Sequence, residues 1–351
     1  MKSIQKIQKA RSILLQTFVI MLITLTIGET ALRVYYHYFP TFIFYSRSYE
    51  RFRGKPFAEE WDFTLNSQGF KDEEFSAKKK NVYRILGIGD SFSFGVVPYK
   101  YNYLTLIEWQ LRLKNTNLEV LNMGIPSIGP KDYLSLLVKE GLFLQPDMVL
   151  LSFFIGNDFD ESKKKKYYEY SYVVSLIRYA IQLQSTYEGR IIHGNAEYCD
   201  DCSSFDREQY LQIEYGRSAI YLVDNKSFFE KLDNALYYLK QIRDICNKYD
   251  IKLVIAIIPD ELQINQSLLR EVKETYYPNI ESDKWDIAFP NRILSNELNK
   301  LNISNIDLYE YFAKSSQQLY RPRDTHWNIA GNQLAANIIQ EYILNHIKHT
   351  N

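Results

Sequence analysis

The chain has 351 residues and carries 42 basic and 42 acidic side chains, so its formal net charge at pH 7 is zero. This balance excludes the strongly basic surface that nucleic-acid binding needs, and we expect no nucleic-acid partner. The length is sufficient for one large α/β domain besides terminal segments.

The first forty residues have the pattern of a membrane-targeting segment. Four basic residues within positions 1–11 precede the uncharged stretch from Ser12 to Gly28, which as a helix extends roughly 25 Å. Basic charge on the amino side places the rest of the chain outside the cytoplasm. We therefore predict a cytoplasmic segment 1–11, an uncleaved signal-anchor helix 12–32 in the lipid bilayer and a juxtamembrane linker 33–60. A cleaved signal peptide is the main alternative.

Beyond the linker, predicted strands and helices alternate at the spacing of βαβ units. The predicted strands are 84–89, 119–122, 147–155, 252–258 and 303–308, and the predicted helices are 103–113, 131–143, one that begins near Ser227, and 328–347. The strand 147–155 is the most apolar and should be central. The pattern predicts a three-layer α/β/α sandwich, with a five-stranded, mainly parallel, flavodoxin-like sheet, over residues 61–351.

Residues 158–226 interrupt this alternation and are too long for an ordinary loop. The interruption leaves the sheet at the carboxyl end of a strand, which places it to cover a site there. It includes a predicted helical segment near 173–183 and the pair Cys199 and Cys202. In an oxidising compartment this pair is best explained as a local disulfide, with a thiol-redox site as the less favoured reading. Cys246 lies on the apolar face of a predicted helix, where a buried, inert thiol is expected.

Three short turns follow three of the predicted strands. They are Gly89-Asp90-Ser91, Asn122-Met123-Gly124 and Gly156-Asn157-Asp158. Parallel strands bring their carboxyl ends to one edge of a sheet, so these turns should lie together. A fourth segment, Arg323 to Asn328, precedes the last helix and contains His326, the one histidine that the pattern places as a catalytic base.

Together these residues have the composition of a serine-based active site. A serine hydroxyl needs a base to remove its proton, and an imidazole acts best when a carboxylate orients it. Ser91, His326 and Asp324 supply these groups. The N–H groups of Ser91 and Gly124 and the side-chain amide of Asn157 are candidates for the oxyanion hole. Each residue alone has a structural explanation, such as a helix cap or a turn, and only the combination indicates catalysis.

The four segments GDSFSFG, NMGIPSIG, IGND and DTHWN resemble the blocks of the SGNH, or GDSL-like, hydrolase superfamily. The resemblance covers about residue 66 to the C-terminus, apart from the insertion. It implies that Ser91 is the nucleophile, that Gly124 and Asn157 complete the oxyanion hole, and that Asp324 and His326 complete the triad. The family includes esterases, lipases, carbohydrate acetylesterases and some O-acetyltransferases, and it implies no metal or other cofactor.

One feature departs from the usual family pattern, in which the acid stands three residues before the histidine. Here Arg323 occupies that position and Asp324 stands two before. This spacing resembles the DxHW form of SGNH-like proteins that acetylate exported polysaccharides.

These observations predict a membrane-anchored, extracytoplasmic serine esterase, in the periplasm or on the cell surface. Its substrate would be an O-acyl ester of envelope carbohydrate, with O-acetyl as the favoured acyl group. The alternatives are an O-acyltransferase that acetylates a cell-envelope polysaccharide and a non-catalytic glycan-binding module on the same fold. The oligomeric state is not predicted.

Overall fold

The computed structural model describes residues 2–39, 46–114, 117–161 and 170–347. The chain divides into two compact units, which we describe separately. The first comprises residues 1–46 and 164–186, and the second comprises residues 47–163 and 187–351.

The first unit contains two described helices, α1 (Lys2–Tyr38) and α6 (Tyr172–Leu183). Among the described residues, α1 is the one helix that is long and apolar enough to cross a membrane. Its side chains from residue 4 to residue 27 are exposed in this structure. It extends beyond the predicted span 12–32 at both ends. Its composition and length are consistent with a signal sequence or an anchor.

The second unit is built around a parallel sheet of five strands in the order β4-β3-β5-β6-β7. The strands are β3 (Tyr83–Ile88), β4 (Leu118–Asn122), β5 (Met148–Phe154), β6 (Lys252–Ile258) and β7 (Ser304–Asp307). β5 is central and buried along its whole length, as its continuous apolar run predicts. The predicted α/β fold and its five-stranded parallel sheet are therefore confirmed.

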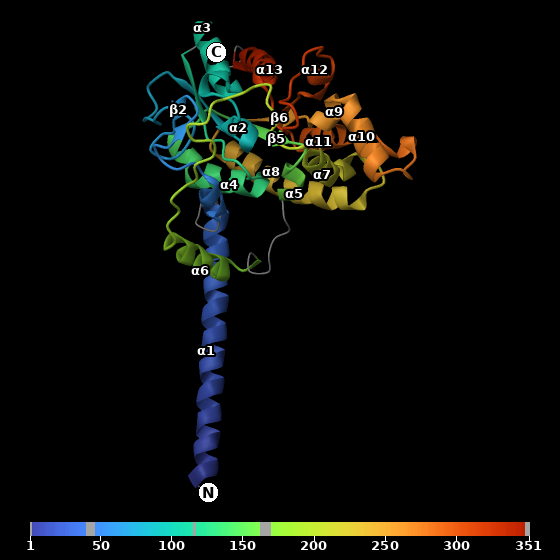
Figure 1. Ribbon diagram of the computed structural model, residues 1–351. Coiled ribbons are helices and arrows are strands. Elements are labelled where there is room, and N and C mark those ends of the chain that lie inside the picture. The colour runs from blue at the N-terminus through green and yellow to red at the C-terminus, as the bar shows by residue number, and fades with distance from the viewer. Residues whose placement is uncertain (1, 40–45, 115–116, 162–169, 348–351) are drawn as a thin grey trace. The chain divides into compact units, whose positions relative to one another are not determined.

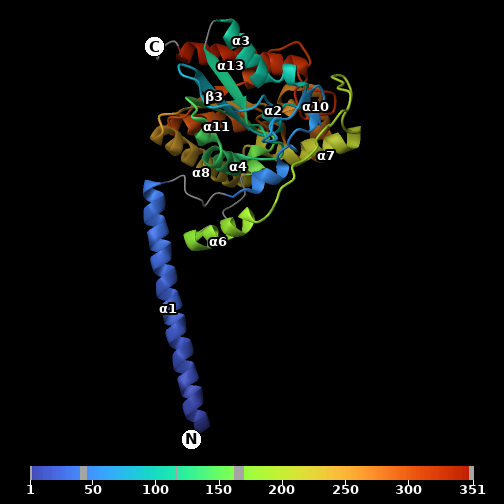
Figure 2. The ribbon, with the colours of Figure 1, turned by 90° about the vertical axis from the view of Figure 1, so that its left-hand side faces the viewer.

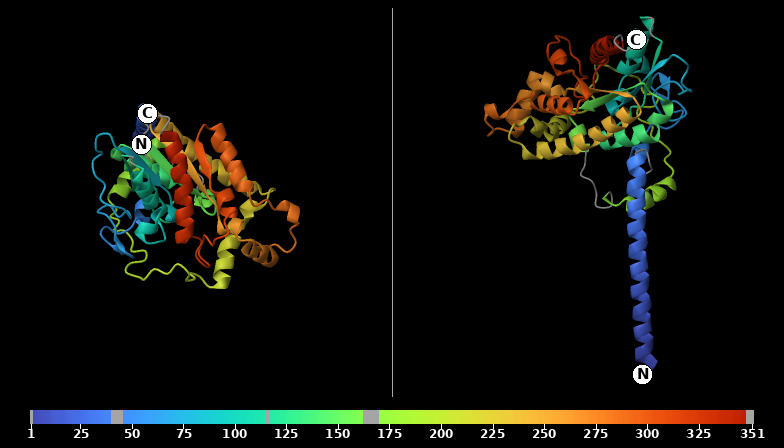
Figure 3. Two further views of the ribbon diagram at one scale, coloured as in Figure 1. Left: turned by 90° about the horizontal axis from the view of Figure 1, so that it is seen from above. Right: turned by 180° about the vertical axis from the view of Figure 1, so that it is seen from behind.

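Helices cover both faces of the sheet. On one face α3 (Tyr103–Leu113) packs against β4 and against α13 (Ile329–Ile347), and on the other α4 (Pro130–Lys139) packs against α8 (Lys226–Lys248). Figure 1 shows α3 and α13 above the sheet and α4 and α8 below it, and the left view of Figure 3 looks down on the sheet from the side of α13. The predicted three layers are thus present.

The remaining helices surround the carboxyl edge and the periphery of the sheet. They are α2 (Ser91–Phe94), α5 (Asp158–Glu161), α7 (Arg207–Ser218), α9 (Glu261–Ile264), α10 (Gln266–Tyr276), α11 (Phe289–Lys300) and α12 (Tyr309–Ala313), with 3-10 turns at Ser48–Phe52, Tyr99–Tyr101, Gly141–Leu144, Ala219–Tyr221 and Ser282–Lys284. A two-stranded antiparallel ribbon, β1 (Glu59–Glu60) and β2 (Phe63–Thr64), precedes the sheet.

Two sequence-based expectations differ from the structure. The helix expected over 131–143 ends at Lys139, and a 3-10 turn begins at Gly141. A Cβ at Gly141 would lie 2.7 Å from Leu86 Cδ2, so the chain needs glycine where it passes this close to the sheet. In addition, α7 was not expected within the insertion, because its sequence is largely polar and only Tyr210, Leu211, Glu214 and Ser218 are buried.

Candidate active site

Ser91 lies where the sheet meets a short helix. β3 ends at Ile88, and Ser91 is the first residue of α2. The Asp90 carboxylate caps this helix by accepting a hydrogen bond from Phe92 N at 2.9 Å. A helix leaves the N–H groups of its first turn without intrahelical acceptors, so the backbone at Ser91 faces the site with donor capacity. The strand-to-helix turn therefore presents both the hydroxyl and an amide at the carboxyl edge of the sheet.

Asp90 is fully buried beneath this turn. Burial raises the pKa of its carboxyl group, while the hydrogen bond from Phe92 N, the nearby His326 and the side-chain amide of Asn157 oppose that effect.

The structure brings Ser91, His326 and Asp324 together in series. His326 Nε2 lies 2.8 Å from Ser91 Oγ, and His326 Nδ1 lies 2.7 Å from Asp324 Oδ1. The backbone N–H of His326 also donates to Asp324 Oδ1 at 3.0 Å. These are the distances that proton transfer from a hydroxyl to an oriented imidazole requires. Residues 91 and 326 are separated by most of the domain in sequence, and they meet because both adjoin the same sheet edge.

Asp324 is held from both sides. Its second carboxylate oxygen accepts hydrogen bonds from Ser204 Oγ and, at 2.9 Å, from Arg321 Nη1. Asp324 is 4% exposed. Burial raises the pKa of this carboxyl group, but the hydrogen bonds and charge of His326 and the Ser204 hydroxyl outweigh it and hold the pKa below its ordinary value. Asp324 is therefore ionised at neutral pH and able to orient the imidazole.

The three predicted oxyanion-hole residues lie on the turns that follow β3, β4 and β5. A Cβ at Gly124 would lie 2.1 Å from Phe94 N, so glycine is required where this turn passes α2. The Gly124 N–H donates to Asn122 Oδ1 at 2.8 Å. To bind an oxyanion, this N–H must donate to both oxygens or leave Asn122. The oxygen of the Asn157 side chain is buried, and among the described residues it has no hydrogen-bond partner. The oxyanion roles of these residues remain a proposal.

Trp327 supports the site from behind. It is 1% exposed, and its ring contacts Phe92 at 4.9 Å between centroids, while Phe92 also lies 5.3 Å from the His326 ring. Trp327 therefore packs behind the loop that carries His326. This aromatic layer limits the rotation of the imidazole.

The sequence predicted that the insertion covers the site, but not that it contacts the loop that carries Asp324 and His326. Cys199 and Cys202 form a disulfide, and the segment 198–205 that contains it lies against the loop 321–329. Arg321 Nη2 donates to the Cys199 carbonyl at 3.3 Å, and the Ile329 N–H donates to Asp200 Oδ1 at 3.1 Å. The available signal was a local disulfide in a polar insertion at the carboxyl edge, but the pattern did not indicate which loop it would contact.

A cavity of about 550 Å³ lies beside the catalytic loop. Residues of α7, α9 and α10 line it, together with Tyr320, Pro322 and Arg323. Arg323 adopts a left-handed backbone conformation with φ of 47°. Ser91, Asp324 and His326 do not line this cavity, which reaches the loop before α13 at Pro322 and Arg323.

A model of a known protein family matches the C-terminal part of the chain. Residues 218–351 match the family model described as "SGNH hydrolase-like domain, acetyltransferase AlgX". This match includes Asp324 and His326 and does not reach Ser91. No curated protein matches the chain.

Among solved structures, the chain is similar to an acetyl xylan esterase, with 17% identity, 74% of this chain and 99% of that chain covered, and a TM-score of 0.41. It is also similar to a lipase/acylhydrolase from Enterococcus faecalis, with 14% identity, coverage of 75% and 96%, and a TM-score of 0.44. A mutant of an acetyl-xylooligosaccharide esterase from Geobacillus has 12% identity, coverage of 74% and 93%, and a TM-score of 0.41.

The C-terminal part of the chain, residues 218–351, is thus similar to SGNH hydrolase-like domains of the AlgX acetyltransferase type.

Proposed function

We propose that this protein is a membrane-anchored, extracytoplasmic SGNH esterase that acts on O-acetyl esters of envelope carbohydrate through an acyl-serine intermediate. The observation that carries the proposal is the hydrogen-bonded series from Ser91 Oγ through His326 to Asp324. In addition, α1 is apolar and long enough to hold the domain at a membrane, and its basic amino end supports an extracytoplasmic domain through the positive-inside rule.

The reaction follows from the geometry. Ser91 Oγ attacks the ester carbonyl carbon while its proton passes to His326 Nε2, and the tetrahedral oxyanion accepts hydrogen bonds from the N–H of Ser91 and from the groups at Gly124 and Asn157. Asp324 stabilises the imidazolium that forms. When the intermediate collapses, the bond to the alcohol oxygen breaks and His326 returns the proton to that oxygen. A second hydroxyl compound then attacks the acyl-serine by the reverse proton path.

The identity of that second compound separates two functions. If water attacks, the protein is an esterase; if a sugar hydroxyl attacks, it is an O-acetyltransferase. The match of residues 218–351 to an acetyltransferase family supports transfer as the second candidate. Both candidates use the same serine, imidazole and carboxylate.

The experiment that tests the proposal is acyl-enzyme mass spectrometry on the full chain in detergent, with an activated acetyl ester as donor. We expect an added acetyl group on Ser91, and no such adduct in Ser91→Ala, which should keep its fold by circular dichroism. Oligosaccharide competing with water as acceptor then distinguishes transfer from hydrolysis. Absence of the adduct and of labelling by a serine-directed phosphonate in the unaltered chain would favour the glycan-binding alternative.

A variant of the acid tests its orienting role. Asp324→Asn should lower kcat less than Ser91→Ala or His326→Ala does, since the orienting member of a triad commonly contributes least. An Asp324→Asn variant as inactive as Ser91→Ala, with intact fold, would contradict the assigned order of roles.

A further inference from the structure

The helix α6 is amphipathic and exposed on its apolar half. At 3.6 residues per turn, one half of its surface is apolar and the other polar. The apolar half consists of Val173, Val174, Leu176, Ile177, Ala180, Ile181 and Leu183, and the polar half contains Ser175, Arg178, Tyr179 and Gln182. No residue of α6 is buried, and the exposed fractions are 40% for Val174, 54% for Ile177, 62% for Ile181 and 53% for Leu183. So much exposed apolar surface on one short helix indicates a binding surface.

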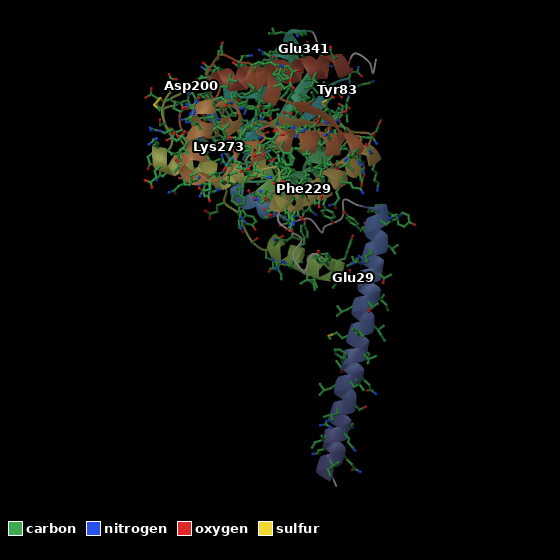
Figure 4. All side chains as sticks on the ribbon, turned by 90° about the vertical axis from the view of Figure 1, so that its right-hand side faces the viewer. Glu29, Tyr83, Asp200, Phe229, Lys273 and Glu341 are labelled. Carbon is green, nitrogen blue, oxygen red and sulfur yellow. A yellow bond between two sulfur atoms is a disulfide. The ribbon has the colours of Figure 1, made fainter. Side chains whose placement is uncertain are left out.

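The N-terminus of α6 is fixed to α1. The Glu29 carboxylate accepts hydrogen bonds from Tyr172 N at 3.0 Å, Val173 N at 3.1 Å and Ser171 Oγ at 2.9 Å. Negative charge at a helix N-terminus is favourable because it pairs with the unsatisfied N–H groups and the helix dipole. Figure 4 labels Glu29 on α1 at the level of α6, and Figure 2 shows α6 projecting away from α1 at this level.

Arg33 strengthens the same junction from the other side. It pairs with Glu29, donates to the Tyr170 carbonyl at 2.7 Å, and its guanidinium lies 4.6 Å from the centroid of the Tyr172 ring. These contacts fix both the position of α6 along α1 and the rotation of its first turn.

The junction lies where the apolar part of α1 ends. The uncharged stretch of α1 runs from Ser12 to Gly28, so Glu29 stands at its outer boundary. The rotation of α6 about its own axis decides which half of its surface faces the apolar stretch of α1. Val173, at the centre of the apolar half, lies 3.5 Å from the Cβ position of Gly28, whereas Tyr172 contacts Arg33 and Tyr36 further out. The apolar half of α6 therefore faces the apolar stretch of α1.

We propose that α6 is an in-plane membrane helix, whose apolar half inserts into the outer boundary of the bilayer that α1 spans. The occupant of this surface is lipid, because the surface is continuous with the apolar stretch of α1 and faces the same side. Amphipathic helices of this kind insert their apolar face about 5–10 Å into the boundary between headgroups and acyl chains. The inference rests on the proposed anchor role of α1, and it adds a second membrane contact, formed by the insertion.

Spin labelling of the full chain in phospholipid vesicles tests the inference. Single labels are attached at Ile177→Cys and Ile181→Cys on the apolar half, and at Gln182→Cys on the polar half as the matched control. Interference from native cysteines is limited, because Cys199 and Cys202 are bonded and Cys246 is buried. Oxygen concentrates in lipid and a nickel chelate stays in water. We expect the oxygen-to-nickel accessibility ratio at positions 177 and 181 to exceed that at 182 severalfold.

The other outcomes overturn the inference and are distinguishable from one another. If all three labels are open to the nickel chelate while the chain stays with the vesicles, α6 lies in water and the anchor role of α1 stands. If the apolar-half labels are shielded from both reagents and couple to each other, a second copy covers the surface. If the chain has lost α1 by cleavage and is recovered in the aqueous fraction, the anchor proposal fails together with this inference.

Discussion

The hydroxyl of Ser204 offers a sharp test of how the insertion supports the site. The Asp324 carboxylate accepts four hydrogen bonds from the described residues, two from His326 on Oδ1 and one each from Ser204 and Arg321 on Oδ2. Ser204→Ala removes one donor and leaves the rest. A hydrogen bond to a charged group contributes about 1.5–3 kcal/mol. Since Arg321 still satisfies Oδ2, the lower value applies, which corresponds to a decrease in kcat of roughly tenfold.

The assay is steady-state hydrolysis of an activated acetyl ester by the full chain. We expect kcat to fall and KM to stay unchanged, because Ser204 contacts the acid of the triad. Ser203→Ala is the matched control. Ser203 is exposed and adjacent to Ser204, but the serine that donates to Asp324 is Ser204. Ser204→Thr keeps the hydroxyl and should restore most of the activity.

The reasoning would be refuted by wild-type kcat in Ser204→Ala, or by an equal decrease in Ser203→Ala. A change confined to KM would also refute it, because the serine would then act on substrate binding and not on the orientation of Asp324.

Three further predictions concern the fold around the site. Replacing Cys199 and Cys202 by serine should lower kcat by about the same factor as Ser204→Ala, while labelling by a serine-directed phosphonate persists. An unchanged kcat would show that the disulfide does not support the site. Gly124→Ala should reduce the free energy of unfolding by about 2 kcal/mol or more, measured by denaturant titration, because its Cβ meets Phe94 N; an unchanged midpoint would show that the turn can move. Burial lowers the pKa of Lys71 to about 7. Because the unfolded chain then binds more protons than the folded chain between pH 7 and about 10, this residue should make stability increase across that range by up to about 1.4 kcal/mol per pH unit. Lys71→Met should flatten the rise of the thermal midpoint with pH. An identical dependence of the midpoint on pH in both proteins would contradict the prediction.

The sequence alone determined the sheet and the location of the candidate triad. Continuous apolar runs ending at Gly-rich turns specify buried parallel strands, and the carboxyl ends of such strands must meet at one edge. This rule alone is enough to predict that Ser91 lies near the turns of Gly124 and Asn157. The single well-placed histidine, His326, with Asp324 two residues before it, completed the set because the chemistry of an activated hydroxyl requires those groups.

Only the tertiary structure decided which groups surround that set. Within the insertion, Ser204 contacts Asp324, and the disulfide segment contacts Arg321 and Ile329. Such contacts depend on loop geometry that has no periodic signal in sequence. The same holds for Glu29, whose charge marks the end of an apolar stretch in sequence but whose carboxylate caps α6. Burial patterns arise from the local period of helices and strands, whereas hydrogen bonds between distant loops arise from the packing of the whole chain, so only the former can be predicted from residue order.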